Sequence, residues 1–330
     1  MNKLSKYRSE LFGIATIGIV LNHYQYFAIG IPRIIATALS YGGSGVYIFV
    51  LLSGLGLYYS LSSPNKSLSS FYKKRAFRIF IPYFLIAGIW YLIKYLIILK
   101  DPINFIYELS TVSFWLEHRG AWYVAMLIPV YLVFPFIYLW IEQSGKYRLH
   151  KTVVLLTVNL LGGIALFFVD ASLFDHLRSV WCSLFFFIIG EYIGKPIREN
   201  NYNDLPLLFG SIIIVLVKMI IPPLRNFVPM YTLTYALSGV IMAIILSRVF
   251  SVFSIKVIKA FLRYIGRHSL EMYLSNLVWI QFFQFFKIKF SFDNHGLFTY
   301  GIILLLGFVT SILVGNVVEF FSIKRKMVNI

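Results

Sequence analysis

The sequence predicts an all-α integral membrane protein, a polytopic bundle of about ten transmembrane helices. Of its 330 residues, 59% are hydrophobic and only 13% are charged, against roughly 25% charged residues in a soluble domain. A soluble core of this size could not bury so many apolar side chains, so lipid must cover much of the surface. No polar linker of useful length divides the chain, and we therefore expect a single domain over residues 1–330.

Ten apolar runs come close to the roughly 20 residues that a helix needs to cross a bilayer. Polar residues do not alternate within these runs, which excludes transmembrane strands. A further apolar stretch, residues 105–116, is too short to span and is expected to form an interfacial or re-entrant helix. The ten predicted spans are residues 11–28, 41–60, 77–99, 121–141, 152–169, 177–194, 206–221, 231–250, 269–286 and 298–320.

The net charge of +17 is concentrated in the short loops between the apolar runs. One set of alternate loops and termini carries 21 Lys and Arg residues, and the other set carries 7. Because basic residues accumulate on the cytoplasmic side, this bias predicts that both termini are cytoplasmic in a multi-pass protein of the plasma (inner) membrane. The basic loops also suit contact with anionic lipids of the bilayer. We expect no nucleic-acid partner.

The remaining composition excludes several classes of site. The one cysteine, Cys182, lies in an apolar run, so an intrachain disulfide and a Cys-based metal site are both excluded. No cluster of His, Asp and Glu has the spacing of metal ligands, and we expect no metal site. Basic residues before the first apolar run resemble a signal peptide. Polar residues 22–26 interrupt that run, however, and predict a retained first span.

His23 is the first candidate for chemistry. It lies about two-thirds of the way along the first predicted span, among polar neighbours. An ionisable group at such a depth is costly and usually marks a functional pathway. Neutral imidazole is also the usual general base near neutral pH. A histidine that only bonds two helices together would give the same pattern, and residue type and depth leave both interpretations open.

A basic cluster marks the point where the third span enters from the cytoplasm. It contains Lys73, Lys74, Arg75 and Arg78. In a helix, Arg75 and Arg78 share a face at a spacing of three, and Lys74 and Arg78 share one at a spacing of four. Two guanidinium groups so placed can hold phosphates by forked hydrogen bonds. An anchor that sets topology needs the same residues, and taken alone the cluster favours that simpler interpretation.

Other polar groups lie near span ends. Tyr123 follows the fourth span's start on the outer side, and Tyr273 and Asn276 lie in the ninth span. Aromatic belts at the membrane surface explain tyrosines there without any catalytic role. The glycine-rich start of the second span, residues 42–46, favours close helix packing. No Lys and Ser/Thr follow it, which excludes a P-loop.

Several segments taken together resemble the acyltransferase-3 family of membrane acyltransferases. Each segment is weak alone, but they occur in the family's order and cover nearly the whole chain. The matching pieces are residues 8–15 with His23, residues 43–49 and 53–59, residues 71–79, Trp122 and Tyr123 leading to Pro135, and residues 265–274.

The resemblance implies transfer of an acyl group, usually acetyl, from cytoplasmic acyl-CoA to a hydroxyl of a surface glycan or related acceptor. Acetyl-CoA or another acyl-CoA would be a co-substrate, with no permanently bound cofactor. The family's first-span histidine falls on His23, and its paired arginines fall on Arg75 and Arg78. The resemblance therefore favours the functional interpretation of both features.

Three departures from the family pattern stand out. Many members carry an arginine eleven residues before the histidine, where this chain has Phe12, and the nearest candidates here are Arg8 and Glu10. Many also have a histidine at the position of Asn276. Some members carry a C-terminal esterase-like extracellular domain. This sequence ends soon after the tenth span, so we expect transfer to finish within the membrane domain or with an extracytoplasmic partner enzyme.

The expected mechanism uses His23 as general base on the acceptor hydroxyl. Arg75 and Arg78, with help from Lys73 and Lys74, would hold the phosphates of acyl-CoA. Asn276, Tyr273 or Tyr123 would stabilise the oxyanion. A covalent acyl-enzyme relay is an alternative. A secondary transporter or flippase for a glycolipid or small polar solute, and a non-catalytic family member, are the rival functions. Inverted repeats would favour the transporter, and none is visible.

Overall fold

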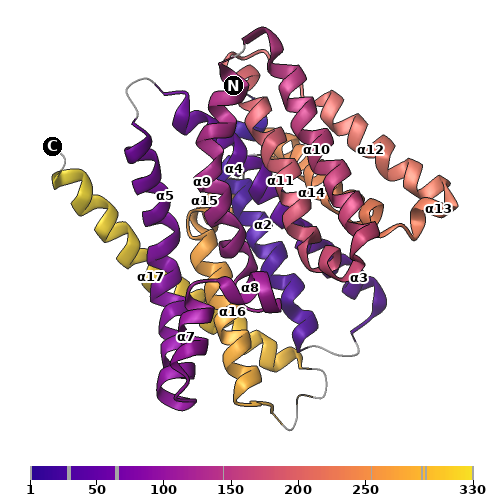
Figure 1. Ribbon diagram of the computed structural model, residues 1–330. Helices are drawn as coiled ribbons and strands as arrows, with labels where there is room; N and C mark the ends of the chain where they lie inside the picture. The colour runs from indigo at the N-terminus through magenta and orange to yellow at the C-terminus, as the bar shows by residue number, and fades with distance from the viewer. Residues whose placement is uncertain are drawn as a thin grey trace. The chain divides into compact units, whose positions relative to one another are not determined.

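The fold is entirely helical over the part of the chain that the structure describes (Figure 1). The computed structural model describes residues 2–27, 31–63, 67–143, 145–253, 255–290, 293 and 296–328, with side chains up to residue 320. No strand occurs among these residues. The prediction of an all-α protein is therefore confirmed.

Seven helical segments are long and apolar enough to cross a membrane. They are Arg33–Leu61, Leu68–Ile98, Trp122–Glu142, Gly145–Val169, Ala171–Arg198, Val228–Val252 and Leu297–Phe320. The helical membrane bundle is thus supported, and each of the seven coincides with a predicted span.

The other three predicted spans fall on shorter helices. These are α2 (Arg8–Asn22), α12 (Leu205–Ile220) and α16 (Ser269–Phe285), with 15, 16 and 17 residues. A bilayer core of about 30 Å needs about 20 helical residues, so these helices are short for a span on their own. The predicted end of the first span, Ala28, lies outside the described residues. The count of ten spans and the cytoplasmic termini remain predictions.

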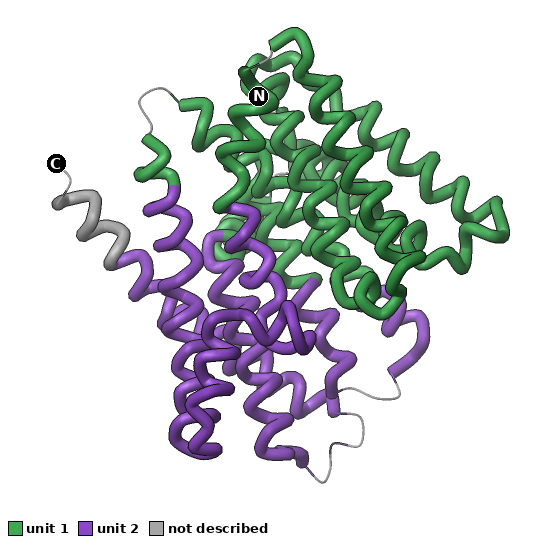
Figure 2. The backbone as a smooth tube through the Cα atoms, in the orientation of Figure 1, with its two compact units in different colours: residues 1–18, 41–71, 132–266 green, residues 19–40, 72–131, 267–330 purple. Residues whose placement is uncertain are grey.

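The chain forms two compact units, each assembled from segments that are far apart in sequence (Figure 2). Unit 1 comprises residues 1–18, 41–71 and 132–266, and unit 2 comprises residues 19–40, 72–131 and 267–330. Because the chain passes repeatedly from one unit to the other, neither is a continuous stretch of sequence. The single domain predicted from the sequence is not tested by this division and remains a prediction.

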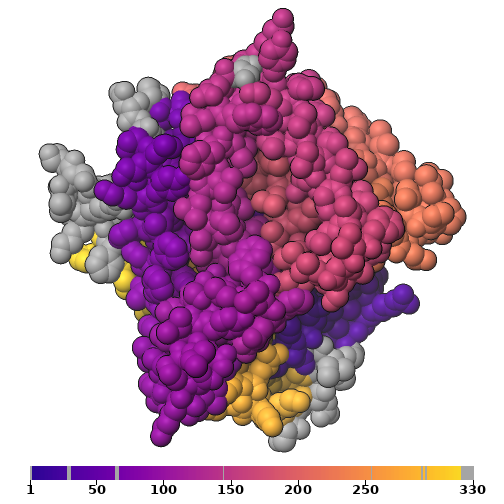
Figure 3. Space-filling view, in the orientation of Figure 1, coloured from indigo at the N-terminus to yellow at the C-terminus, as the bar shows by residue number. Residues whose placement is uncertain are grey.

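Unit 1 is built around the long helix α11, which packs along α4 and α10, while α14 packs on α4 and α12. Side chains of α10 and α11 cover much of the face of unit 1 seen in Figure 3. Its elements are α1 (Lys3–Lys6), most of α2, η2 (Gly42–Ser44), α4 (Gly45–Leu61), η5 (Gly145–Tyr147), α10 (Arg148–Val169), α11 (Ala171–Arg198), α12, α13 (Pro222–Arg225), α14 (Val228–Val252) and α15 (Lys256–Arg267).

Glycines explain the closeness of α4 and α11. A Cβ atom placed on Gly190 of α11 would lie 2.0 Å from the carbonyl oxygen of Leu51, and one on Gly54 of α4 would lie 2.3 Å from that of Phe187. The two backbones therefore touch directly, as small residues permit in membrane helices. The predicted packing role of glycines in the second span holds at Gly54.

Unit 2 contains both π-helical segments of the described chain. The α5 helix contains Pro82, which supplies no backbone N–H, and the π-helical segment η3 follows it directly. The elements of this unit are η1 (His23–Tyr26), α3 (Arg33–Tyr41), α5 (Leu68–Tyr83), η3 (Phe84–Gly88), α6 (Ile89–Tyr91), the π-helical η4 (Leu92–Ile98), α7 (Pro102–Leu109), α8 (Val112–Glu117), α9 (Trp122–Glu142), α16 and α17 (Leu297–Val328). Five helices of the described chain cross a boundary between the units, namely α2, α3, α5, α9 and α15.

The stretch predicted to be interfacial or re-entrant forms two short helices, α7 and α8. Thr111 separates them with a left-handed backbone, φ 64°. At 8 and 6 residues, neither helix is long enough to cross a bilayer. The prediction of a short, non-spanning segment here agrees with the structure.

Candidate functional site

His23 lies at the point where one helix changes its winding. The α-helical turns of α2 end at Asn22, and a tighter 3₁₀ turn, His23–Tyr26, continues the chain. Short 3₁₀ stretches in a helix often mark functional positions. This end of the helix is fixed within unit 2, because the hydroxyl of Tyr300 on α17 donates a hydrogen bond to the carbonyl of Val20.

A hydrogen bond joins His23 to Asn276 of α16. The His23 Nδ1 and the Asn276 Oδ1 atoms are 2.7 Å apart. An amide oxygen can only accept, so Nδ1 carries the proton in this arrangement and Nε2 keeps its lone pair. Asn276 is buried, and His23 is half-buried. When the imidazole is neutral, this bond selects the tautomer that a general base requires.

Two tyrosines complete this group. The ring of Tyr273, also on α16, lies 6.5 Å from the imidazole of His23, measured between ring centres. Tyr123, near the start of α9, meets Tyr273 edge to face at 5.9 Å. The structure thus brings together the four residues that the sequence predicted around the chemistry, His23, Asn276, Tyr273 and Tyr123. They come from two helices, α9 and α16, and from the 3₁₀ turn that follows α2.

The basic cluster lies on α5, as predicted. Arg75 is half-buried and its guanidinium lies 5.8 Å from the ring centre of Tyr131 on α9. Lys73 and Lys74 are exposed on the same helix. Arg78 donates a hydrogen bond to the carbonyl of Arg267, just before α16 begins. The two arginines are therefore anchored by different neighbours, while the lysines extend to the surface.

One helix connects the two groups of residues. Glu271 near the start of α16 faces Arg78 at 3.7 Å, and Asn276 on the same helix bonds His23. At 1.5 Å per residue, these two positions are about 7–8 Å apart along the helix axis.

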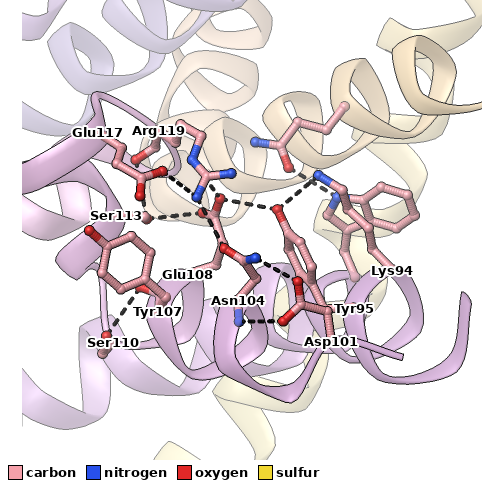
Figure 4. A network of polar contacts seen from close by, with 12 residues as sticks. Lys94, Tyr95, Asp101, Asn104, Tyr107, Glu108, Ser110, Ser113, Glu117 and Arg119 are labelled. Carbon is pink, nitrogen blue, oxygen red and sulfur yellow. Dashed lines mark hydrogen bonds and ion pairs between the residues drawn. The ribbon is translucent and has the colours of Figure 1, made fainter. Parts of the chain in front are cut away.

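A polar network fixes the chain segment that leads into Tyr123 (Figure 4). The buried carboxylate of Glu108 on α7 accepts hydrogen bonds from Tyr95, at 3.2 Å, and Ser113, at 3.0 Å. Arg119 is 3.7 Å from the same carboxylate and 2.6 Å from Glu117. These contacts hold α7, α8 and the turn before α9 as one piece.

Asp101 caps the first turn of α7 in the same network. Its carboxylate accepts from the backbone N–H of Asn104 at 3.0 Å and from the Asn104 side chain at 2.6 Å. The side-chain bond, with the backbone bonds, holds the pKa of Asp101 below its usual range. Sequence reasoning did not single out Glu108, Asp101 or Tyr131, because each looks like an ordinary loop or span residue until its partner is known.

Phe12, where many relatives carry an arginine, is an apolar packing position within unit 1. Its ring stacks on Phe49 at 5.0 Å. The guanidinium of Arg8 lies over the Phe12 ring, 5.2 Å from the ring centre, and also lies against Gly56. Glu10 instead pairs with Arg263 at 3.3 Å. Of the two nearby candidates, Arg8 is therefore the one whose charged group lies against the side chain of Phe12.

Among the described residues, no group of three or more His, Cys, Asp or Glu side chains is placed to hold a metal ion. The free thiol of Cys182 is buried in α11. The absence of a metal from the reaction remains a prediction.

Fold and site together define a membrane protein made of helices, with a buried imidazole–amide pair and a basic cluster on one helix near it. The chain matches the family described as acyltransferase domain, of the acyltransferase-3 type, over residues 13–316. It therefore belongs to the acyltransferase-3 family of membrane acyltransferases. No curated protein and no solved structure matched the chain.

Proposed function

We propose that the protein transfers an acyl group, in the first instance acetyl, from acyl-CoA to a hydroxyl of an exported or cell-surface glycan or a related acceptor. Acyl-CoA is the co-substrate and no cofactor stays bound. Membership of an acyltransferase family supports the general activity. The observation that carries the specific proposal is the His23–Asn276 pair, which leaves Nε2 of His23 able to accept a proton.

The donor is held at its phosphates by the basic face of α5. Arg75 and Arg78 are three residues apart and so lie on one side of the helix. Guanidinium groups bind phosphate through paired, charge-assisted hydrogen bonds. The exposed Lys73 and Lys74 add positive charge that attracts a polyanionic donor. The basic-loop bias supports a cytoplasmic orientation of this face, on the side where acyl-CoA is made.

The chemical step starts at His23. Nε2 takes the proton of the acceptor hydroxyl while the oxygen attacks the thioester carbonyl carbon. The tetrahedral intermediate then expels the CoA thiolate, and the imidazolium returns the proton to that sulfur. The products are the acyl ester and CoA thiol. Hydroxyl groups of Tyr273 and Tyr123, whose rings are in contact, are the proposed donors to the oxyanion.

Asn276 has a different task from the one expected from sequence. Its oxygen accepts from Nδ1, so it orients the imidazole and stabilises the imidazolium as it forms, like the orienting carboxylate of a hydrolase triad. Being neutral, an amide stabilises that cation less than a carboxylate would. The buried setting compensates in part, because hydrogen bonds are stronger where water is excluded.

Titration calorimetry with acetyl-CoA tests the donor part of the proposal. We expect the purified wild type to bind with micromolar affinity. The Arg75→Ala/Arg78→Ala variant should lose roughly 10²-fold or more, since each hydrogen bond to a charged group contributes about 1.5–3 kcal/mol. Lys146→Ala/Lys256→Ala is the matched control, because it removes the same charge from exposed positions on other elements.

Binding that both double variants weaken equally would show a general charge effect and not a site on α5. A wild type that binds neither acetyl-CoA nor longer acyl-CoAs would contradict the donor proposal outright.

A further inference from the structure

Glu271 is a buried carboxylate next to the proposed donor site. Its side chain is 0% exposed, and neither of its oxygens accepts a hydrogen bond within the described residues. Its ion-pair partner is Arg78, with Nη1 and Oε1 3.7 Å apart. A charge-assisted hydrogen bond would measure about 2.7–2.9 Å. The carboxylate is therefore held near the arginine by charge alone.

Burying the Glu271 carboxylate in this way lowers the stability of the fold. Burying a carboxylate is costly unless it is paired at close range and its lone pairs are satisfied. Gln would fill the same space without the charge. A structural role for Glu271 therefore explains neither the long distance to Arg78 nor the lack of hydrogen bonds.

Arg78 is only partly engaged by its protein neighbours. Its side chain is 45% exposed. One Nη atom donates to the carbonyl of Arg267, and the other faces Glu271. Guanidinium has five N–H donors in a planar fork. Donors therefore remain for a ligand that arrives from the exposed side, while Glu271 stays behind the arginine.

We propose that Glu271 is an internal counter-ion, which neutralises Arg78 when the donor is absent and weakens the hold of Arg78 on phosphate when the donor is present. The inference rests on the proposed donor site and assigns a regulator of its affinity. A phosphate on Arg78 would lie close to a second negative charge in a medium of low dielectric, where like charges repel strongly. Glu271 is thus a positioning residue that acts through Arg78.

Weaker binding of phosphate favours turnover, because it speeds the release of the CoA product. Acyl-CoA and the product CoA carry the same phosphates, so a site that binds the donor very tightly also retains the product. Product release limits the rate of many enzymes. A carboxylate behind the arginine lowers both affinities together and lets CoA leave.

The test is calorimetry of three ligands on Glu271→Gln, which keeps shape and removes charge. We expect acetyl-CoA and CoA to bind about tenfold more tightly than to wild type, a change equivalent to about 1.4 kcal/mol. Acetyl-pantetheine, which lacks the nucleotide phosphates, should bind equally to both proteins. A purely structural role would not separate the ligands in this way.

Two further variants define the mechanism. On an Arg78→Ala background, Glu271→Gln should change nothing, because the carboxylate acts only through that arginine. Glu319→Gln is the control for loss of a carboxylate charge, since Glu319 lies in unit 2 at the same distance, 3.7 Å, from a nitrogen atom, Nε2 of His268. If Glu271→Gln does not fold, Glu271→Asp draws the charge back by one methylene and should tighten binding in the same direction, by less.

Weaker binding of acetyl-CoA to Glu271→Gln, or to Glu271→Asp, would overturn the inference, because it would mean that the carboxylate helps Arg78 to hold phosphate. Unchanged binding would overturn it as well. Neither result would contradict the proposed donor site. That proposal is contradicted only if the wild type does not bind acyl-CoA.

Discussion

Unit 1 and unit 2 pack their helices by different means. In unit 1, backbones meet at glycines, as where Gly190 lies on Leu51 and where Gly266 lies on Ser9. Both units also bury charged side chains, and in unit 1 Glu191 and Arg148 lie beside each other. Unit 2 buries Glu108, Glu271 and the Asn276 that bonds His23. Its helices also depart from regular winding at the 3₁₀ turn of His23–Tyr26 and at the two π-helical segments.

We interpret unit 1 as the structural scaffold and unit 2 as the unit that carries the proposed site. Glycine contacts give close, rigid packing without polar groups. Buried polar groups in a membrane protein are costly and usually belong to a functional pathway. Irregular turns also tend to occur at functional positions. We therefore expect substitutions in unit 1 to act through stability, and substitutions at the polar positions of unit 2 to act through activity.

A large effect on activity, which tests the comparison from the side of unit 2, is expected at Asn276. Asn276→Ala removes the acceptor for His23 Nδ1–H and should lower the rate of acyl transfer by about 10- to 100-fold, from the loss of about 1.5–3 kcal/mol in a bond to a developing charge. Thermal stability and acetyl-CoA affinity should change little. Initial rates with acetyl-CoA, alongside a melting curve, measure both. A rate loss matched by an equal loss of folded protein would assign Asn276 to the scaffold.

Asn276 also shows how far sequence reasoning reached. Residue type and depth pointed to His23 and Asn276 separately, since both are polar positions in apolar runs. Their contact joins residues 253 positions apart, and no spacing rule connects positions so distant in sequence. This contact is the reason that we propose Asn276 as the partner of the imidazole, whereas the sequence suggested an oxyanion donor.

The helices themselves followed from hydrophobicity, because each apolar run must satisfy its backbone internally. Their irregularities did not follow. Pro82 lies in the third predicted span, just before the first π-helical segment. The second π-helical segment, Leu92–Ile98, has no proline within it. The partner of Arg75, Tyr131, belongs to another helix and carried no signal of its own.

Two glycine substitutions test the structural role of unit 1. We expect smaller effects here, which change the free energy of unfolding in opposite directions. Gly190→Ala places a Cβ atom 2.0 Å from a backbone oxygen of α4, so we expect a loss of about 1–3 kcal/mol as the helices are forced apart. Gly162→Ala in α10 has nothing within 4 Å and should gain about 0.5–1 kcal/mol from helix propensity. Thermal unfolding in detergent, followed by tryptophan fluorescence, compares the two. Equal stability of both variants would contradict the direct contact of α4 and α11.

The smallest expected effect is local and depends on pH. The folded state lowers the pKa of Asp101, so its cap on α7 is fully present above the unfolded pKa, about 3.9, and is lost as pH falls through the lower folded value. Hydrogen exchange of α7 amides, corrected for intrinsic rates, should be slower in wild type than in Asp101→Ala at pH 6. The difference between the two proteins should shrink as the pH falls below about 3.9. Identical exchange at pH 6 would mean that the cap does not stabilise α7.

The central claim is that His23 removes the proton from the acceptor hydroxyl. The most direct measurement follows radiolabelled acetyl from acetyl-CoA into an alkali-labile product, in membranes of the source cells that carry wild type, His23→Gln or the control His150→Gln, an exposed histidine of α10. We predict that His23→Gln transfers label about 10²- to 10⁴-fold more slowly, the range for loss of a general base, while it still binds acetyl-CoA and His150→Gln behaves as wild type. Transfer by His23→Gln at a rate close to that of wild type would contradict the account.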